Sequence, residues 1–195
     1  MKQAEIIKQL TSKQLKQQVW LSQLLLFVIA LLLTYILFND LSTFWSLFNV
    51  SIDDLLLFGV GIAIVIVAID VLIMKMFPSK WWDDGGINQK LFQEGSYFEI
   101  ISMCFVIAVS EEWLFRGVIQ TNFGIIIAST IFAIIHVRYL SKMILFLSVI
   151  GLSFLLGFVY EWTNSLTVVI TLHFLIDVLL AIMIRTWRFR NASKL

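Results

Sequence analysis

The sequence predicts an all-α protein, a polytopic transmembrane helical bundle with about six membrane segments. Hydrophobic residues make up 60% of the chain and charged residues 14%, whereas an average soluble domain has roughly 25% charged residues. The chain contains one Pro and 9 Gly, so few residues would interrupt a helix. Its apolar residues form long blocks, without the alternation of an outer-membrane β-barrel. These features exclude a disordered protein, a disulfide-linked scaffold and an ordinary cytosolic enzyme.

We expect residues 1–195 to form a single membrane-embedded domain. A helical span needs about 20 apolar residues, and residues 20–38 form the first candidate. The arm before it, residues 1–18, carries four Lys and is expected to be amphipathic and cytosolic. The second candidate covers residues 55–77 and ends before Pro78, where a polar stretch begins.

Four more segments follow this polar stretch. The third begins near Phe98 and is apolar until Ser110. The fourth, residues 123–136, would be about 21 Å long as a helix, which is short for a full span. It is either tilted within a locally thinned membrane or a partial helix buried against its neighbours. The fifth and sixth segments cover residues 143–160 and 166–184.

The placement of Lys and Arg predicts the orientation of these segments. They gather in the N-terminal arm, the loop 78–97, the turn 138–142 and the C-terminal tail, whereas the loops 39–54 and 161–167 contain none. Because basic loops stay in the cytosol, six segments place both termini on the cytosolic side. We therefore expect a multi-pass protein of the plasma membrane, whose basic tail contacts lipid and not nucleic acid.

Residues 98–184 hold the side chains that can carry chemistry. A charged group in the middle of a membrane costs about 2.5–3.5 kcal/mol, so intramembrane acids and histidines indicate function by default. The alternative is a structural role as interhelical hydrogen bonds, worth about 0.6 kcal/mol each, but a set of five is hard to explain in this way. The set includes both histidines of the chain: Glu111, Glu112, His136, His173 and Asp177.

The spacing of the first acids predicts an ion pair. Glu112 and Arg116 are four residues apart with the acid first, which is the favourable order on a helix. Glu111 precedes Glu112 by one residue and is therefore rotated by about 100° around the same helix. Its side chain points away from the ion pair and is available for another role.

The two histidines have neighbours at helical spacing as well. His173 and Asp177 lie on one face of a helix. Phe132 precedes His136 by one turn, so its ring can pack on the imidazole. Three helical segments could therefore bring polar groups to one buried cavity.

These residues resemble the motifs of the CPBP family, the CAAX proteases and bacteriocin-processing proteins, which include Abi-type membrane peptidases. The stretch EEWLFRG, residues 111–117, is similar to the EExxxR motif of that family in its EExxFRG form. FAIIH, residues 132–136, is similar to its second motif, FxxxH. HFLID, residues 173–177, is similar to its third, His-x-x-x-Asn or Asp. The three motifs occur in the family's order and span roughly a third of the chain.

The resemblance implies an intramembrane endopeptidase that hydrolyses a peptide bond of a membrane-associated protein or peptide. Carried over, Glu111 and His136 would activate the water, and His173 with Asp177 would stabilise the oxyanion. The chain departs from the Asn of the best understood branch at Asp177. An ionised Asp would repel an oxyanion, so it must be protonated, bind a metal or orient His173 through its ring N–H. We expect three further residues to structure the site: Glu112, Arg116 and Phe132.

Two mechanisms remain open for this site. In the first, which the resemblance favours, a buried glutamate activates water and no cofactor is required. In the second, zinc is bound by Glu111, His136 and His173, with one position left for water. The spacing does not separate the two, because the ligands would come from three helices.

Other functions are compatible with part of the pattern. A non-catalytic membrane scaffold or a bacteriocin-immunity protein would need the bundle without the chemistry. A small transporter could use intramembrane acids as a proton relay, but the chain lacks two halves with matching interrupted helices. The expected partners are a membrane-associated protein or peptide substrate and the lipid bilayer, with no nucleic acid.

Overall fold

The computed structural model describes residues 10–136 and 142–192, and this part of the chain is helical without strands. Four helical stretches are long and apolar enough to cross a membrane. They are α2 (Ser12–Leu37), the stretch Ile52–Met76, α11 (Met143–Thr163) and the part Leu166–Thr186 of α12 (Leu166–Ala192).

Two further helical segments carry the first and second candidate motifs, and the third motif lies on α12. The third segment is α8 (Tyr97–Glu112), which continues through the π-helix η2 (Trp113–Gln120) into α9 (Thr121–Phe123). The short fourth segment is α10 (Ile125–Ile135). The predicted all-α fold is therefore confirmed, and four long spans with these two segments agree with about six.

The second span changes its helix type near its start. It begins with α4 (Ile52–Asp54), continues as the π-helix η1 (Leu55–Gly61) and ends as α5 (Ile62–Met76). Three short helices lie in the connections: α3 (Leu41–Ser46), α6 (Ser79–Trp82) and α7 (Ile87–Phe92).

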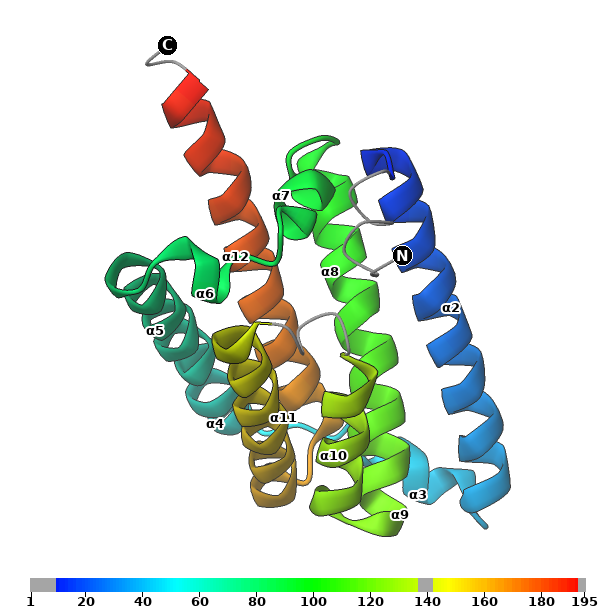
Figure 1. Cartoon of the computed structure of the whole chain (residues 1–195). Coiled ribbons are helices and arrows are strands. Elements are labelled where there is room, and N and C mark those ends of the chain that lie inside the picture. Colours follow the sequence, from blue (N-terminus) through cyan, green and yellow to red (C-terminus); the bar gives the residue numbers. More distant parts are fainter. Residues whose placement is uncertain (1–9, 137–141, 193–195) are drawn as a thin grey trace.

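The ends of the helices divide between two sides of the bundle. In Figure 1, α2 begins and α12 ends at the upper side, where α7 also lies, whereas α3, α4 and α9 lie at the lower side. Helices α2 and α12 therefore enter and leave the bundle on the same side, as an even number of segments requires.

Helix α2 begins earlier than the predicted span, because Thr11 and Gln14 form a capping box at its N-terminus. Much of the predicted arm is thus continuous with the span, while residues 1–9 lie outside the described part. The helix turns small and polar side chains inward and leaves Leu21, Leu24 and Leu25 exposed. This inverse pattern is typical of a helix that faces lipid.

Helix α12 is at the centre of the bundle. It packs against α8, η1, α5 and α11, and its Leu166, Val168, Val169 and Leu172 are fully buried. A second apolar cluster, which includes the buried Cys104, joins α12 to α8. These contacts hold the first and third motifs on neighbouring helices.

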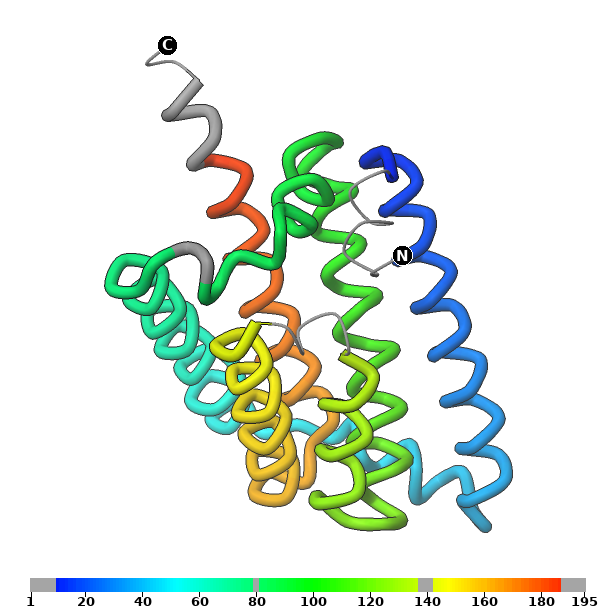
Figure 2. Tube along the Cα trace, in the orientation of Figure 1, coloured from blue at the N-terminus to red at the C-terminus, as the bar shows by residue number. Residues whose placement is uncertain are grey.

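The fourth segment is shorter than a full span, as its length in the sequence predicts. The chain turns at Gly124, whose φ of +85° favours glycine, and α10 then has 11 residues, about 17 Å. Figures 1 and 2 show that it rises only partway from the lower side of the bundle. It packs against α11 and η2. In the predicted basic turn, residues 138–141 lie outside the described part, including Arg138.

Candidate active site

The first motif lies where α8 changes from an α-helix to a π-helix. Glu111 and Glu112 are the last residues of α8, and Arg116 lies in η2. The Thr121 hydroxyl donates a hydrogen bond to the Arg116 carbonyl oxygen at 3.0 Å, which satisfies one backbone group of the altered turn. Short π-helical stretches occur frequently at functional sites.

Glu112 is the centre of a buried ionic cluster. Its side chain is fully buried, and its Oε2 lies 3.2 Å from Arg116 Nε, which is the predicted ion pair. Its Oε1 lies 2.7 Å from His173 Nδ1 on α12. Arg116 in turn donates to the Ser153 carbonyl oxygen at 2.7 Å and to its hydroxyl at 3.0 Å. The cluster therefore joins η2, α12 and α11.

Glu111 lies in a different environment, as predicted from its position on the helix. Its side chain is 6% exposed, and its Oε1 accepts a hydrogen bond from Gln23 Nε2 of α2 at 3.1 Å. The Gln23 carbonyl oxygen accepts from the Ser110 hydroxyl at 2.6 Å. Glu111 is thus held by a neutral amide.

Phe132 connects the second motif to the other two. Its ring stacks on His136, as predicted, with ring centroids 4.5 Å apart and an interplanar angle of 28°. The same ring lies 6.5 Å from the His173 ring and 4.8 Å from the Arg116 guanidinium carbon. A single aromatic side chain therefore contacts the basic groups of all three motifs.

The third motif places His173 between two carboxylates. Its Nδ1 faces Glu112, and its Nε2 lies 3.6 Å from Asp177 Oδ2. That second distance is too long for a hydrogen bond, so Asp177 acts on the ring as a nearby charge. The Asp177 side chain is 30% exposed.

The three predicted zinc ligands are each oriented by another group. His136 Nδ1 lies 2.7 Å from the Phe132 carbonyl oxygen, His173 Nδ1 faces Glu112, and Glu111 binds Gln23. Within the described residues, no group of three His, Cys, Asp or Glu side chains is arranged to hold a metal ion.

Three buried polar residues around the predicted site residues were not themselves predicted. Gln23 interrupts the first apolar span, and the cost of a polar group in a membrane is a signal that could have indicated it. Ser153 and Ser129 are buried on α11 and α10, where the Ser129 hydroxyl donates to the Ser153 carbonyl oxygen at 3.3 Å. Small hydroxyls are common inside membrane bundles, so nothing in the sequence distinguishes these two.

Comparison with known proteins identifies the class to which this site belongs. The family model described as "Type II CAAX prenyl endopeptidase Rce1-like" matches residues 93–179, a range that contains all three motifs. The chain is 44% identical over 165 residues to a protein of Bacillus subtilis (strain 168), "Uncharacterized protein YpbD". That alignment covers 85% of this chain and 87% of YpbD.

The chain belongs to the Rce1-like CAAX prenyl endopeptidase family. Its predicted resemblance to CPBP proteases is confirmed, and by family the Rce1-like chain is a multi-pass membrane peptidase. No solved structure matches it. The matched range begins at residue 93, so α2 and its Gln23 lie outside the part that the family model describes.

Proposed function

We propose that this Rce1-like chain is an intramembrane endopeptidase that hydrolyses a peptide bond of a membrane-associated protein or peptide. One observation carries the proposal: two adjacent buried carboxylates have opposite surroundings. Glu112 is neutralised by Arg116 and His173, whereas Glu111 accepts its hydrogen bond from the uncharged Gln23. A carboxylate that is not locked in an ion pair can accept a proton from water and return it.

Glu111 is the proposed general base. It removes a proton from the attacking water and then delivers that proton to the leaving nitrogen, as peptide hydrolysis requires. His136, held in place by the Phe132 ring and carbonyl oxygen, shares the activation of the water. No cofactor is required in this mechanism.

His173 is the proposed donor to the oxyanion. Nδ1 of His173 donates to Glu112. Nε2 can carry a hydrogen at the same time only if the ring is in the imidazolium form. Glu112 and Asp177 supply the two negative charges next to that ring. Asp177 would then serve as a counter-charge to His173 and need not touch the oxyanion, which accounts for Asp in place of Asn.

In the proposed orientation the chain spans the plasma membrane and both termini lie in the cytosol. It rests on the basic arm, loop and tail and agrees with α2 entering and α12 leaving on one side. Reporter fusions at residues 45 and 163 should read outside, and a fusion at residue 85 should read inside. A reversed result at residue 85 would contradict six segments.

Membrane proteomics of cells with the native chain or with Glu111→Ala tests the function. We expect at least one membrane-associated peptide end to be present with the native chain and missing with the variant. A scaffold or immunity protein would keep its biological effect in the Glu111→Ala variant, and that outcome would overturn the proposal.

A further inference from the structure

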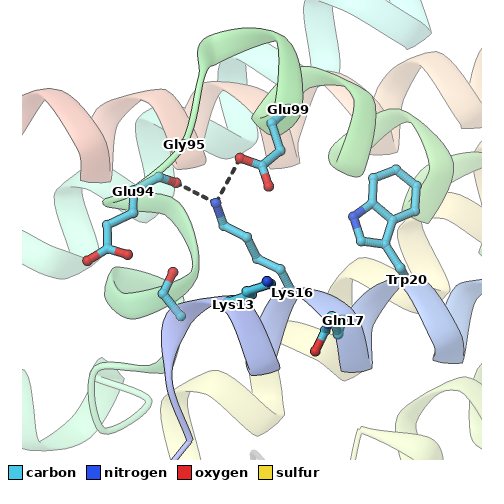
Figure 3. Close-up of a pocket in the computed structure, with 8 residues that line it drawn as sticks. Lys13, Lys16, Gln17, Trp20, Glu94, Gly95 and Glu99 are labelled. Atoms are coloured by element: carbon cyan, nitrogen blue, oxygen red, sulfur yellow. Dashed lines mark hydrogen bonds and ion pairs between the residues drawn. The ribbon is translucent and has the colours of Figure 1, made fainter.

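A second polar site, drawn in Figure 3, lies next to the start of α2, at the upper side of the bundle in Figure 1, and contains no residue of the three motifs. It is a pocket of about 350 Å³ between the first turns of α2 and the turn that joins α7 to α8. This volume is in the range of small-molecule sites, about 300–1,000 Å³. The residues that matter for its chemistry are Ser12, Lys13, Lys16, Trp20, Glu94 and Glu99.

One wall of the pocket is fixed by Lys16. Its Nζ donates to the Glu94 carbonyl oxygen at 2.6 Å and to Glu99 Oε2 at 2.9 Å, as Figure 3 shows. Gly95, with a φ of +107°, lies directly against this pair, and a Cβ there would be 2.5 Å from Lys16 Nζ. A side chain at position 95 would therefore push the Lys16 and Glu99 side chains aside and would strain the backbone, whereas glycine leaves the ion pair intact.

Other groups of the pocket remain available to a ligand. Ser12 is 9% exposed, and its hydroxyl has no hydrogen-bond partner among the described residues. Lys13 and the Glu94 side chain are exposed, and Glu99 uses one carboxylate oxygen for Lys16. A buried hydroxyl without a partner is costly, so a ligand that supplies an acceptor would be stabilised here.

The lining carries both signs of charge and borders the apolar surface of α2. The residues that line it include two lysines and two glutamates, which disfavours a purely anionic ligand. Trp20 lies on the span side of the pocket, where an indole is typical of the membrane interface. Beyond it, Leu21 and Leu24 are exposed and offer a surface for acyl chains.

We propose that this pocket binds the headgroup of a zwitterionic phospholipid with a primary ammonium, a phosphoethanolamine lipid. The phosphate binds Lys13 and the Ser12 hydroxyl, and the ammonium donates to Glu94 and Glu99. A quaternary ammonium of the choline type cannot donate these hydrogen bonds, which gives the site its selectivity.

Native mass spectrometry of the full chain with bound lipid tests the proposal. Dioleoyl phosphatidylethanolamine, phosphatidylcholine and phosphatidylglycerol are offered at equal concentrations to the native chain and its variants. We expect the ethanolamine lipid to bind about tenfold more tightly than the others, and Lys13→Gln to remove about that factor. Ser12→Ala should weaken binding by a smaller factor. Lys75→Gln, at an exposed lysine of α5, is the control and should bind as the native chain does.

Three results would overturn the lipid assignment. Equal binding of the three lipids, or equal losses in Lys13→Gln and Lys75→Gln, would show that the pocket does not select a headgroup. A preference for phosphatidylglycerol would make the site an anionic one. Displacement of the lipid by free phosphoethanolamine at similar concentration would assign the pocket to a soluble ligand.

A separate observation concerns Gln23, and it rests on the proposed function. We infer that Gln23 is a positioning residue for Glu111. It is 7% exposed, and both ends of its amide are bound, the oxygen by Ser110 and the nitrogen to Glu111. An amide held at both ends fixes one Glu111 oxygen and leaves the other for water.

The pH profile of kcat separates positioning from mere stability. In Gln23→Leu we expect kcat to fall about tenfold or more with KM unchanged. We also expect a shift, along the pH axis, of the limb of the kcat profile that reflects ionisation of Glu111. Thr34→Val is the control, since Thr34 is another buried polar residue of α2 that bonds Trp113, and its pH profile should be native. A Gln23→Leu variant with the kcat and the pH profile of the native chain would overturn this inference. The proposed function would still stand in that case if Glu111→Gln were inactive. If Glu111→Gln were active, the proposed function would fail as well.

Discussion

Glu111 and Glu112 are neighbours on one helix, yet they belong to two different polar clusters. Glu112, the last residue of α8, lies among charged groups: it pairs with Arg116 of η2 and His173 of α12, and Arg116 extends the cluster to α11. Glu111 lies against a neutral amide from α2. The difference teaches that burial alone does not define a role: a neutralised carboxylate holds helices together, and one bound by neutral donors keeps its capacity for proton transfer.

The largest expected effect comes from removing a charge from the Glu112 cluster. Arg116→Ala leaves a buried carboxylate without its ion-pair partner, which typically costs about 3–5 kcal/mol. Thermal unfolding in lipid nanodiscs should show a large loss of stability, against an unchanged transition for Lys75→Ala. An unchanged transition for Arg116→Ala would mean that the cluster does not hold the bundle.

Ser153 tests the same cluster at a smaller scale. Ser153→Ala removes a hydroxyl that accepts from the Arg116 guanidinium, and hydrogen bonds to charged groups are worth about 1.5–3 kcal/mol. Ser129→Ala removes a neutral hydrogen bond to the Ser153 carbonyl oxygen and should cost about 0.5–1.5 kcal/mol. Equal losses in the two variants would contradict a charge-centred cluster.

A substitution at Asp177 tests the effect of the second carboxylate next to the His173 ring. Asp177→Asn keeps the shape but removes one of the two carboxylates next to the ring. We expect kcat to fall about tenfold, which is about 1.4 kcal/mol, because the imidazolium form becomes less favourable. Higher activity in Asp177→Asn would show that position 177 contacts the oxyanion directly.

The smallest expected effect is that of a metal chelator. Since the proposed mechanism requires no cofactor, cleavage by the reconstituted chain should be unchanged after dialysis against EDTA and phenanthroline. Loss of cleavage, with recovery on addition of Zn²⁺, would favour the zinc mechanism instead.

Features that depend on one segment at a time could be predicted from the sequence. The apolar blocks gave the helical bundle, and the spacing of Glu112 and Arg116 gave their ion pair. The shortness of the fourth segment indicated a partial helix as one of two possibilities. Each of these follows from the geometry of a single helix or the length of a span.

Features that depend on contacts between helices could not be predicted in this way. The pairing of Glu112 with His173 joins α8 to α12, and the pairing of Gln23 with Glu111 joins α2 to α8. Spacing says which face of a helix a residue occupies, but not which helix lies opposite. The π-helix η2 was not predicted either, because its altered turn depends on packing around Arg116 and on the Thr121 hydroxyl. The catalytic roles of Glu111, His136, His173 and Asp177 stay predictions.

The most direct test compares Glu111→Gln with Glu112→Gln in the same membrane, with cleavage and thermal unfolding measured on both. Loss of a general base typically lowers the rate by 10²–10⁴-fold. We expect Glu111→Gln to lose cleavage on this scale while its unfolding stays close to native. Glu112→Gln should instead lose stability together with activity, because Arg116 and His173 lose their shared anion. Cleavage retained in Glu111→Gln, or equal destabilisation of the two variants, would contradict the division of roles between the two carboxylates.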